Sequence, residues 1–152
     1  MSIFYINRKA LIAGAFILIA SYQTFAEIPA EPVKPLALQN IMRDMGKNMQ
    51  AITYGVSRED WALVEKTAPL IADHPEPPLG EKVRILAFVG RDVMKFKNYN
   101  DDTLEAARVL GEAAARKNGY AVISHFATLQ NSCLMCHKSF REPIQQHFYG
   151  KR

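Results

Sequence analysis

Apolar residues recur at helical spacing along the first part of the chain that could belong to a folded core. They follow one another at steps of four, three, four, three and four positions: Leu38, Met42, Met45, Met49, Ile52 and Val56. Such spacing is typical of the buried seam of a packed helix. It predicts a helix over residues 36–56, in which Gly46 could allow a close approach by a neighbour.

A second helix is predicted to begin at Ser57. Ser57 and Asp60 resemble a capping box, with Asp where Glu is usual. Pro69 should kink this helix near its end, because proline has no backbone N–H to donate. The proline-rich stretch 74–78 then ends it.

Three more helices follow from the same periodicity. The third covers 79–97, where Gly90 could divide it, and a turn is expected at 98–101. The fourth runs from Asp102 to an αL-type stop at Asn118-Gly119. The last covers about 120–148 and carries a single inward stripe: Ile123, Phe126, Leu129, Cys133, His137, Phe140 and Ile144. Short connections favour an all-α antiparallel four-helix bundle, with 75–100 as an extra helical crossover segment.

The N-terminus has the pattern of a secretory signal. Arg8 and Lys9 precede an apolar run over 10–20, and Thr24-Phe25-Ala26 offers a cleavage site. An uncleaved membrane anchor is the alternative, but the run is short for a span of about 20 residues. We therefore expect a signal peptide at 1–26, an extended lead-in at 27–35 and a helical bundle at 36–152.

Net charge changes once this segment is set aside. The whole chain has 19 basic and 15 acidic residues, and loss of Arg8 and Lys9 leaves 17 basic residues. No basic run with interleaved aromatic residues is present in the sequence, so we expect no nucleic-acid binding.

The strongest chemical signal is Cys133-Leu134-Met135-Cys136-His137. Two cysteines three positions apart, followed directly by histidine, form the attachment signature of a c-type haem. The thiols become thioethers to the haem, and the histidine binds the iron. A zinc ribbon needs a second cysteine pair, and a thioredoxin-like site needs a βαβ setting. Export agrees with the motif, because bacteria attach this haem outside the inner membrane.

These residues, late in the chain, resemble the class II c-type cytochromes, the cytochrome c-prime group, in its low-spin Met/His-ligated branch. Small class I cytochromes have the opposite order, with the haem motif early. The matching residues are Cys133, Cys136, His137, Phe140-Arg141 and the turn at Lys117-Asn118-Gly119. The resemblance implies a four-helix bundle with one covalent haem near its C-terminus. The segment 75–100 departs from that pattern.

The resemblance also implies iron ligands. His137 corresponds to the proximal ligand. The first helix is similar to that of the soluble four-helix b-type cytochrome, whose axial methionine is followed by apolar residues three, seven and ten positions later. Met42, Met45, Met49 and Ile52 have that spacing, so Met42 is the expected distal ligand. Met45 is the second candidate, core packing is the alternative for each, and a haem without a methionine ligand stays open.

The sequence offers weaker evidence that further residues belong to the haem site. Phe126 and Phe140 could pack on the porphyrin, and Arg141 could pair with a haem propionate or be solvated. Three basic side chains could form a weak docking rim for an acidic redox partner: Lys138, Lys47 and Arg43. No catalytic base or nucleophile stands out.

The expected function is periplasmic electron transfer by a non-enzymatic cytochrome with His/Met ligation. Its partners are redox proteins, as a monomer or homodimer, with membrane contact only through an uncleaved signal. One alternative is a five-coordinate haem that binds NO or CO. Another is weak peroxidase activity, which needs a distal His or Arg; Arg43 lies one position round the helix from Met42.

Overall fold

The computed structural model describes residues 36–150, and within this range the chain is helical with no strand. The elements are α1 (Ala37–Ser57), α2 (Trp61–Thr67), α3 (Pro69–Ala72), α4 (Leu79–Val89), η1 (Gly90–Asp92), α5 (Val93–Ala115), α6 (Gly119–Cys136), η2 (His137–Arg141) and α7 (Glu142–Tyr149). The predicted all-α class is confirmed. The predicted signal peptide and lead-in lie outside the described residues.

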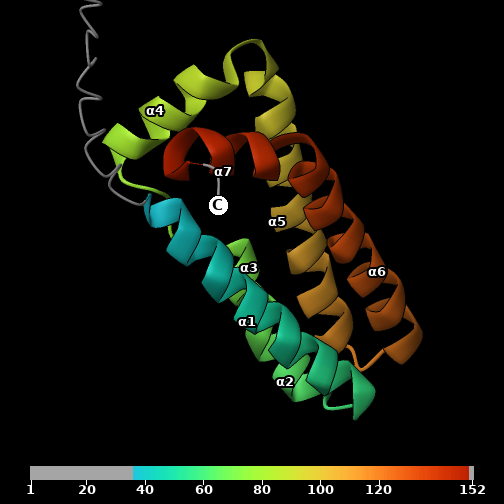
Figure 1. Ribbon diagram of the computed structural model, residues 1–152. Coiled ribbons are helices and arrows are strands. Elements are labelled where there is room, and N and C mark those ends of the chain that lie inside the picture. Colours follow the sequence, from blue (N-terminus) through green and yellow to red (C-terminus); the bar gives the residue numbers. More distant parts are fainter. Residues whose placement is uncertain (1–35, 151–152) are drawn as a thin grey trace, which may run out of the picture. The chain divides into compact units, whose positions relative to one another are not determined.

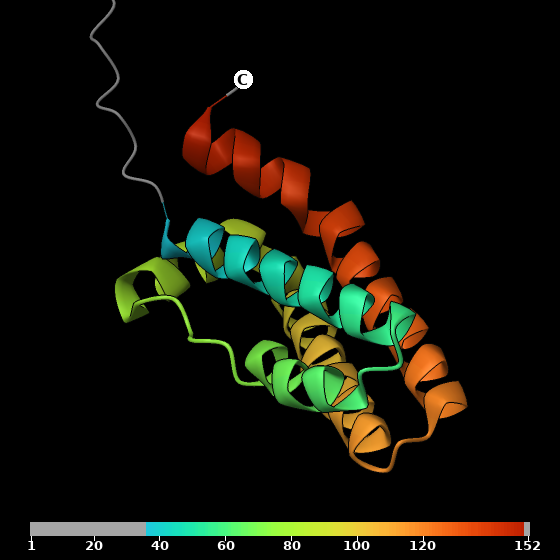
Figure 2. The ribbon, with the colours of Figure 1, turned by 90° about the horizontal axis from the view of Figure 1, so that it is seen from below.

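Four helices pack against each other: α1, α2 with its continuation α3, α5 and α6. Each runs antiparallel to the one before it (Figure 1). The extra crossover is formed by α4 and η1, which lead across to the start of α5. After α6 the chain bends, so that α7 continues in a different direction from α6 (Figure 2). The predicted four-helix bundle is therefore confirmed. The helical crossover is shorter than the predicted 75–100, because residues 93–100 already belong to α5.

The connection between α1 and α2 differs from the prediction. α1 continues through Ser57, whose hydroxyl donates to the Thr53 carbonyl at 2.7 Å. Glu59 then adopts a positive φ of 56°. The cap of α2 is Asp60, whose carboxylate accepts from the Leu63 amide at 3.0 Å. The predicted cap at Ser57 is wrong, because the reversal of the chain uses the residues that follow it.

Close helix approach occurs at Gly55 and not at Gly46. A Cβ added at Gly55 would lie 2.9 Å from Cγ2 of Val64, whereas one at Gly46 would meet nothing within 4 Å. Gly55 is buried near the end of α1, where α2 turns back against it. At Pro69, α2 gives way to α3, as its missing amide hydrogen predicts.

The predicted turn at 98–101 is wrong, since α5 is continuous there. The ring centroids of Tyr99 and Phe140 are 6.3 Å apart. The Thr103 hydroxyl donates to the Tyr99 carbonyl at 2.8 Å. Tertiary packing of this aromatic residue outweighs the turn preference of its Asn and Asp neighbours. The expected division at Gly90 is confirmed by its φ of 54°.

The stop between α5 and α6 lies one residue earlier than predicted. Lys117 has a positive φ of 53°, and the Asn118 side chain caps α6 by accepting from the Ala121 amide at 3.1 Å. The inward face of α6 also differs at its start. Val122 is fully buried, whereas Ile123, expected on that face, is 57% exposed.

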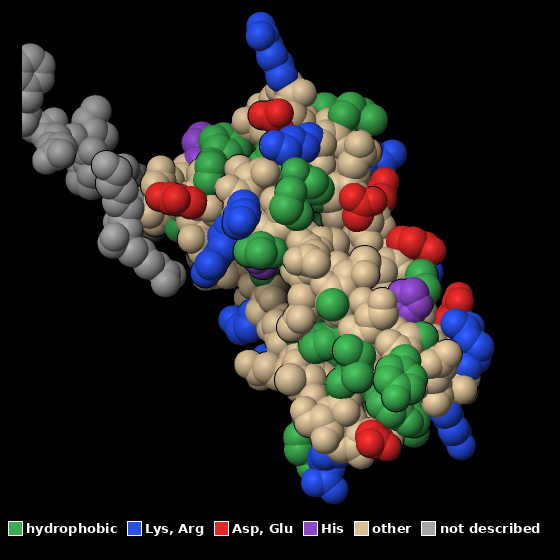
Figure 3. Space-filling model, turned by 90° about the vertical axis from the view of Figure 1, so that its right-hand side faces the viewer, with side chains coloured by type: hydrophobic (Ala, Val, Ile, Leu, Met, Phe, Trp, Pro, Cys, Tyr) green, Lys and Arg blue, Asp and Glu red, His purple; other side chains and the backbone are tan. Residues whose placement is uncertain are grey.

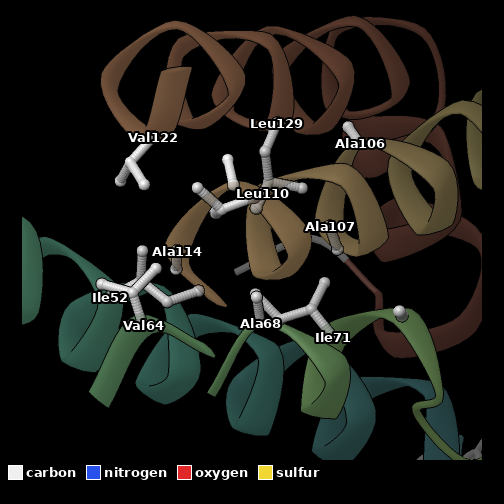
Figure 4. Packing of buried hydrophobic residues seen from close by; sticks show 12 residues of the cluster. Ile52, Val64, Ala68, Ile71, Ala106, Ala107, Leu110, Ala114, Val122 and Leu129 are labelled. Atoms are coloured by element: carbon white, nitrogen blue, oxygen red, sulfur yellow. The ribbon is translucent and has the colours of Figure 1, made fainter. Parts of the chain in front are cut away.

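The buried residues form two separate clusters. The first cluster joins α1, α2, α3, α5 and α6 (Figure 4) and comprises Ile52, Val64, Ala68, Ile71, Ala72, Ala106, Ala107, Leu110, Ala113, Ala114, Val122 and Leu129. The second cluster joins the start of α1 to α4, η2 and α7, and comprises Leu36, Ile85, Val89, Phe140, Ile144 and Phe148. A domain usually has one contiguous core, so this division marks a place where the helices are less closely joined.

Candidate functional site

The Cys-His motif lies where α6 passes into η2. The His137 amide donates to the Cys133 and Leu134 carbonyls, so the helical chain continues through the motif. Residues four apart lie on one side of a helix, which puts Cys133 and His137 on the same side. Both cysteines are free and partly buried, whereas His137 is exposed. The three proposed attachment residues are therefore grouped on consecutive helical turns.

A π-helical turn follows the motif directly. It comprises His137–Arg141, and Pro143 lies in the first turn of α7. Pro143 cannot donate to the carbonyl four residues earlier, and its ring crowds that position. A widened turn relieves the crowding, and π turns of this kind occur often at functional sites. The proline is visible in the sequence, whereas the π turn that precedes it is not.

The motif side chains are shifted toward their neutral forms. Burial raises the pKa of the Cys133 thiol, against an opposing hydrogen bond from Ser132. Burial, followed by the charge of Cys133, raises the pKa of Cys136. Partial desolvation, followed by Arg141, lowers the pKa of His137. A dithiol activated for exchange would have a lowered pKa, which is the opposite direction to that of both cysteines.

The motif spans the division between the two clusters. Cys133 packs against the first cluster, together with Phe126 from about two turns earlier in α6. Cys136 packs against the second cluster, which contains Phe140. Phe140 meets the Phe96 ring edge-on at 5.1 Å. The predicted porphyrin-packing residues Phe126 and Phe140 thus lie on opposite sides of the same division.

The seam of α1 crosses that division too. Leu38 packs against the second cluster, and Met45 and Met49 pack against the first. Met42 lies between them along the helix face, belongs to neither cluster and is 39% exposed. Core packing therefore accounts for Met45 and Met49, but not for Met42. The predicted distal ligand is the seam residue that the described core leaves uncovered.

The remaining histidines have other surroundings. His74 lines a hollow of about 340 Å³ that also contains Met45. His125 lines a hollow of about 420 Å³ between α5 and α6. His147 stacks on the Phe88 ring, with centroids 4.3 Å apart. The hollow at His125 is also lined by Ser132 and Met135, and His147 meets the Phe148 ring of the second cluster edge-on.

Charged side chains around the motif are exposed and only partly paired. Lys138 and Arg141 are exposed on η2. On α1, Lys47 pairs with Asp44 at 2.8 Å, and the Arg43 guanidinium donates to the Asn40 side chain at 2.8 Å. Basic and acidic side chains are interspersed on the face shown in Figure 3. Lys47 and Arg43 thus each have a polar partner on α1 itself.

Two contacts at the start of α1 could not be read from the sequence. The Leu36 amide donates to the Tyr149 hydroxyl at 3.1 Å, and the Ala37 amide donates to a Glu81 carboxylate oxygen at 2.6 Å. The one local sign was that Leu36, at the N-cap, has no side-chain acceptor. A helix that lacks its own capping residue must satisfy its first amides elsewhere.

Comparison with known proteins does not assign the chain to a family. No family model, curated protein or solved structure matches it. Among the helices between residues 36 and 150, none is long and apolar enough to cross a membrane. In the same range, no group of three or more His, Cys, Asp or Glu side chains is arranged to hold a metal ion.

Proposed function

We propose that this chain is a c-type cytochrome that carries one covalently bound haem and transfers single electrons. The observation that supports it best is the division of the core. Both the Cys-His motif of α6 and the methionine seam of α1 cross from one cluster to the other at this division. A flat apolar group placed there would contact both clusters and be flanked by the two segments that contain the proposed ligands.

Each motif residue has a distinct proposed role. Cys133 and Cys136 would form the thioethers by adding their S–H groups across the two haem vinyl groups, and His137 would bind the iron. Met42 provides the sixth ligand through its neutral, soft thioether, which favours ferrous iron and raises the reduction potential. When bound, the haem supplies an iron that gains and loses one electron. The donor types and their spacing fit such a group, and the two cysteines are partly buried.

Aromatic and basic side chains near the motif would surround the haem. Phe126 and Phe140 offer apolar faces from the two clusters. Arg141, exposed next to the motif, is available for a propionate. No role as general base or nucleophile is assigned to any of these side chains, and the proposal contains no substrate chemistry.

The proposed partners are redox proteins with acidic surfaces, in the periplasm. The segments 79–99 and 137–150, around the second cluster, have seven basic and three acidic residues. The segments 57–73 and 101–118, around the first cluster, have five basic and eight acidic residues. This separation of charge would draw an acidic partner toward the second cluster. The proposed periplasmic location rests on the signal-like sequence of residues 1–26.

A second candidate is a five-coordinate haem module that binds NO or CO. The exposure of Met42 favours it in one respect, because no described packing holds that side chain in place. The two functions differ in the sixth coordination position. They therefore predict different spectra for the same protein.

The deciding experiment compares absorption spectra of the oxidised and reduced haem-loaded protein, with and without CO. We expect a low-spin spectrum that changes little with CO, and a high-spin, CO-binding form in Met42→Ala. Met94→Ala is the matched control, because Met94 is 62% exposed on α5. A native protein that is high-spin and binds CO readily would replace electron transfer through Met42 with the second candidate. Absence of covalent haem would reject both.

A further inference from the structure

The first turn of α1 is capped by two residues far away in the sequence. Leu36, at the N-cap, has no side-chain oxygen, and its amide donates to the Tyr149 hydroxyl of α7. The Ala37 amide donates to Glu81 of α4. These donors are 113 and 44 residues from their acceptors. Two of the free amides at the start of α1 are thus satisfied by the crossover and by the last helix.

The two acceptors differ in kind. Glu81 offers a carboxylate at the positive end of the α1 dipole, and such charge-assisted hydrogen bonds are stronger than neutral ones. Tyr149 offers a hydroxyl held at the edge of the second cluster, against which its ring packs. Leu36 between them is 1% exposed and belongs to the same cluster. The start of α1 is therefore fixed by both burial and polar contacts.

Other packing of α1 is concentrated elsewhere. α1 packs mainly on α2 and α3, and it touches α6 only briefly. Met42 lies five residues after Ala37, which is about 7.5 Å along a helix. Met42 itself is not held by either cluster. Met42 therefore lies between two anchored parts of α1, the first turn on one side and the stretch that packs on the first cluster from Met45 onward on the other.

We propose that Tyr149 and Glu81 are positioning residues that hold the first turn of α1, and through it keep Met42 over the candidate haem site. The proposal rests on the proposed function, because it concerns the sixth ligand of that haem. Without these contacts, the first turn of α1 would open more often. Met42 would then leave the iron more often, and an external ligand would bind faster.

The test uses the haem-loaded protein and three variants. Tyr149→Phe removes the hydroxyl and keeps the ring, and Glu81→Gln removes the charge and keeps a side-chain oxygen. Tyr120→Phe is the matched control, because Tyr120 is 92% exposed on α6. Hydrogen exchange of the Leu36–Asn40 amides reports the first turn. The rate of CO binding to the ferrous form reports release of Met42.

We expect Tyr149→Phe to accelerate both exchange and CO binding about fivefold, as for the loss of one intramolecular hydrogen bond. Glu81→Gln should change both in the same direction, and Tyr120→Phe should change neither. Unchanged exchange in both variants would overturn the capping role. Faster exchange with unchanged CO binding would overturn the positioning of Met42. If the native protein already binds CO as fast as Met42→Ala, the proposed function fails, while exchange still judges the capping role separately.

Discussion

The two core clusters are built from different side chains. Half of the twelve residues in the first cluster are alanine, and none is aromatic. The second cluster has six residues, including Phe140 and Phe148, and partly buried Phe88, Phe96, Tyr99 and Tyr149 pack around it. Small side chains let helices approach closely, whereas aromatic side chains fill wider and less regular spaces. One end of the bundle is thus closely packed, and the other is held by large rings and long-range polar contacts.

This difference in packing suggests that the two clusters have different roles. The first cluster draws on every helix of the bundle. The second cluster lies around η2 and the start of α1, the two segments that border the candidate site. The proposed electron transfer would require a site that keeps its ligands in place. In that proposal, the closely packed first cluster would support α6, and the second cluster would border the haem.

The largest expected effect is on Leu110, fully buried in the first cluster. Leu110→Ala should lower the free energy of unfolding by about 2–5 kcal/mol, because it leaves a cavity among closely packed helices. Ile144→Ala in the second cluster should cost less, because Ile144 is 7% exposed and its neighbours can move inward. Urea unfolding followed by circular dichroism measures both. Equal costs would contradict the contrast in packing.

Substitution of two glycines of α1 by alanine should change the stability of the protein in opposite directions. Gly55→Ala should destabilise the protein by about 1–3 kcal/mol, because its Cβ would lie 2.9 Å from Val64. Gly46→Ala should stabilise it by about 0.5–1 kcal/mol, because the new Cβ meets nothing within 4 Å and alanine favours a helix. Thermal unfolding of the two variants makes the comparison. A stabilising Gly55→Ala would mean that α1 and α2 are less closely packed than described.

The cap of α2 gives a smaller effect at the first-cluster end. Asp60→Ala should cost about 1 kcal/mol, because the Leu63 amide loses its acceptor. Ser57→Ala is the matched control and should cost less than about 0.5 kcal/mol, since its hydroxyl only donates to Thr53 in the same helix. Chemical denaturation at neutral pH distinguishes them. The reverse order would restore the capping box expected from the sequence.

The smallest effect is expected in the loop before α4. The Lys82 ammonium lies 2.8 Å from Glu76 and, through this hydrogen bond, lowers the pKa of that carboxyl. The contribution to stability is therefore present above pH 4.5, the ordinary value, and is lost as pH falls through the lower folded pKa. Both side chains are exposed, so Glu76→Gln should change unfolding at pH 7 barely measurably. Denaturation at pH 7 and pH 3 should show that the small difference in unfolding free energy between the native protein and Glu76→Gln disappears in acid.

Helix periodicity predicted the bundle well, because it reports which faces are buried. It misplaced boundaries where distant packing decides them. The Asn and Asp residues near Tyr99 favour a turn locally, yet the ring of Tyr99 packs toward Phe140 and keeps α5 continuous. Ser57 resembled a cap, but the reversal is formed by the positive φ of Glu59. Local preference and tertiary contact disagree at these positions, and only the first is visible in a sequence.

For the candidate site, the grouping of Cys133, Cys136 and His137 on one helical segment follows from spacing alone. The exposure of Met42 between the two clusters could not be predicted from spacing, because all seam positions look alike in an apolar pattern. The π turn at His137–Arg141 could not be predicted either, because it depends on how the backbone relieves the steric crowding caused by Pro143. Haem attachment and ligation stay predictions until the spectra are measured.

The contact between Leu36 and Tyr149 has a consequence for rearranging the gene. These residues bound the described helices at either end, and the Leu36 nitrogen lies 3.1 Å from the Tyr149 hydroxyl. A short linker could therefore join the two ends, with new termini opened in the non-helical segment 74–78. Such a circular permutant would have the Cys-His motif near its middle. Its folding would show that the late place of the motif in the chain is a matter of connectivity, independent of the packing that surrounds it.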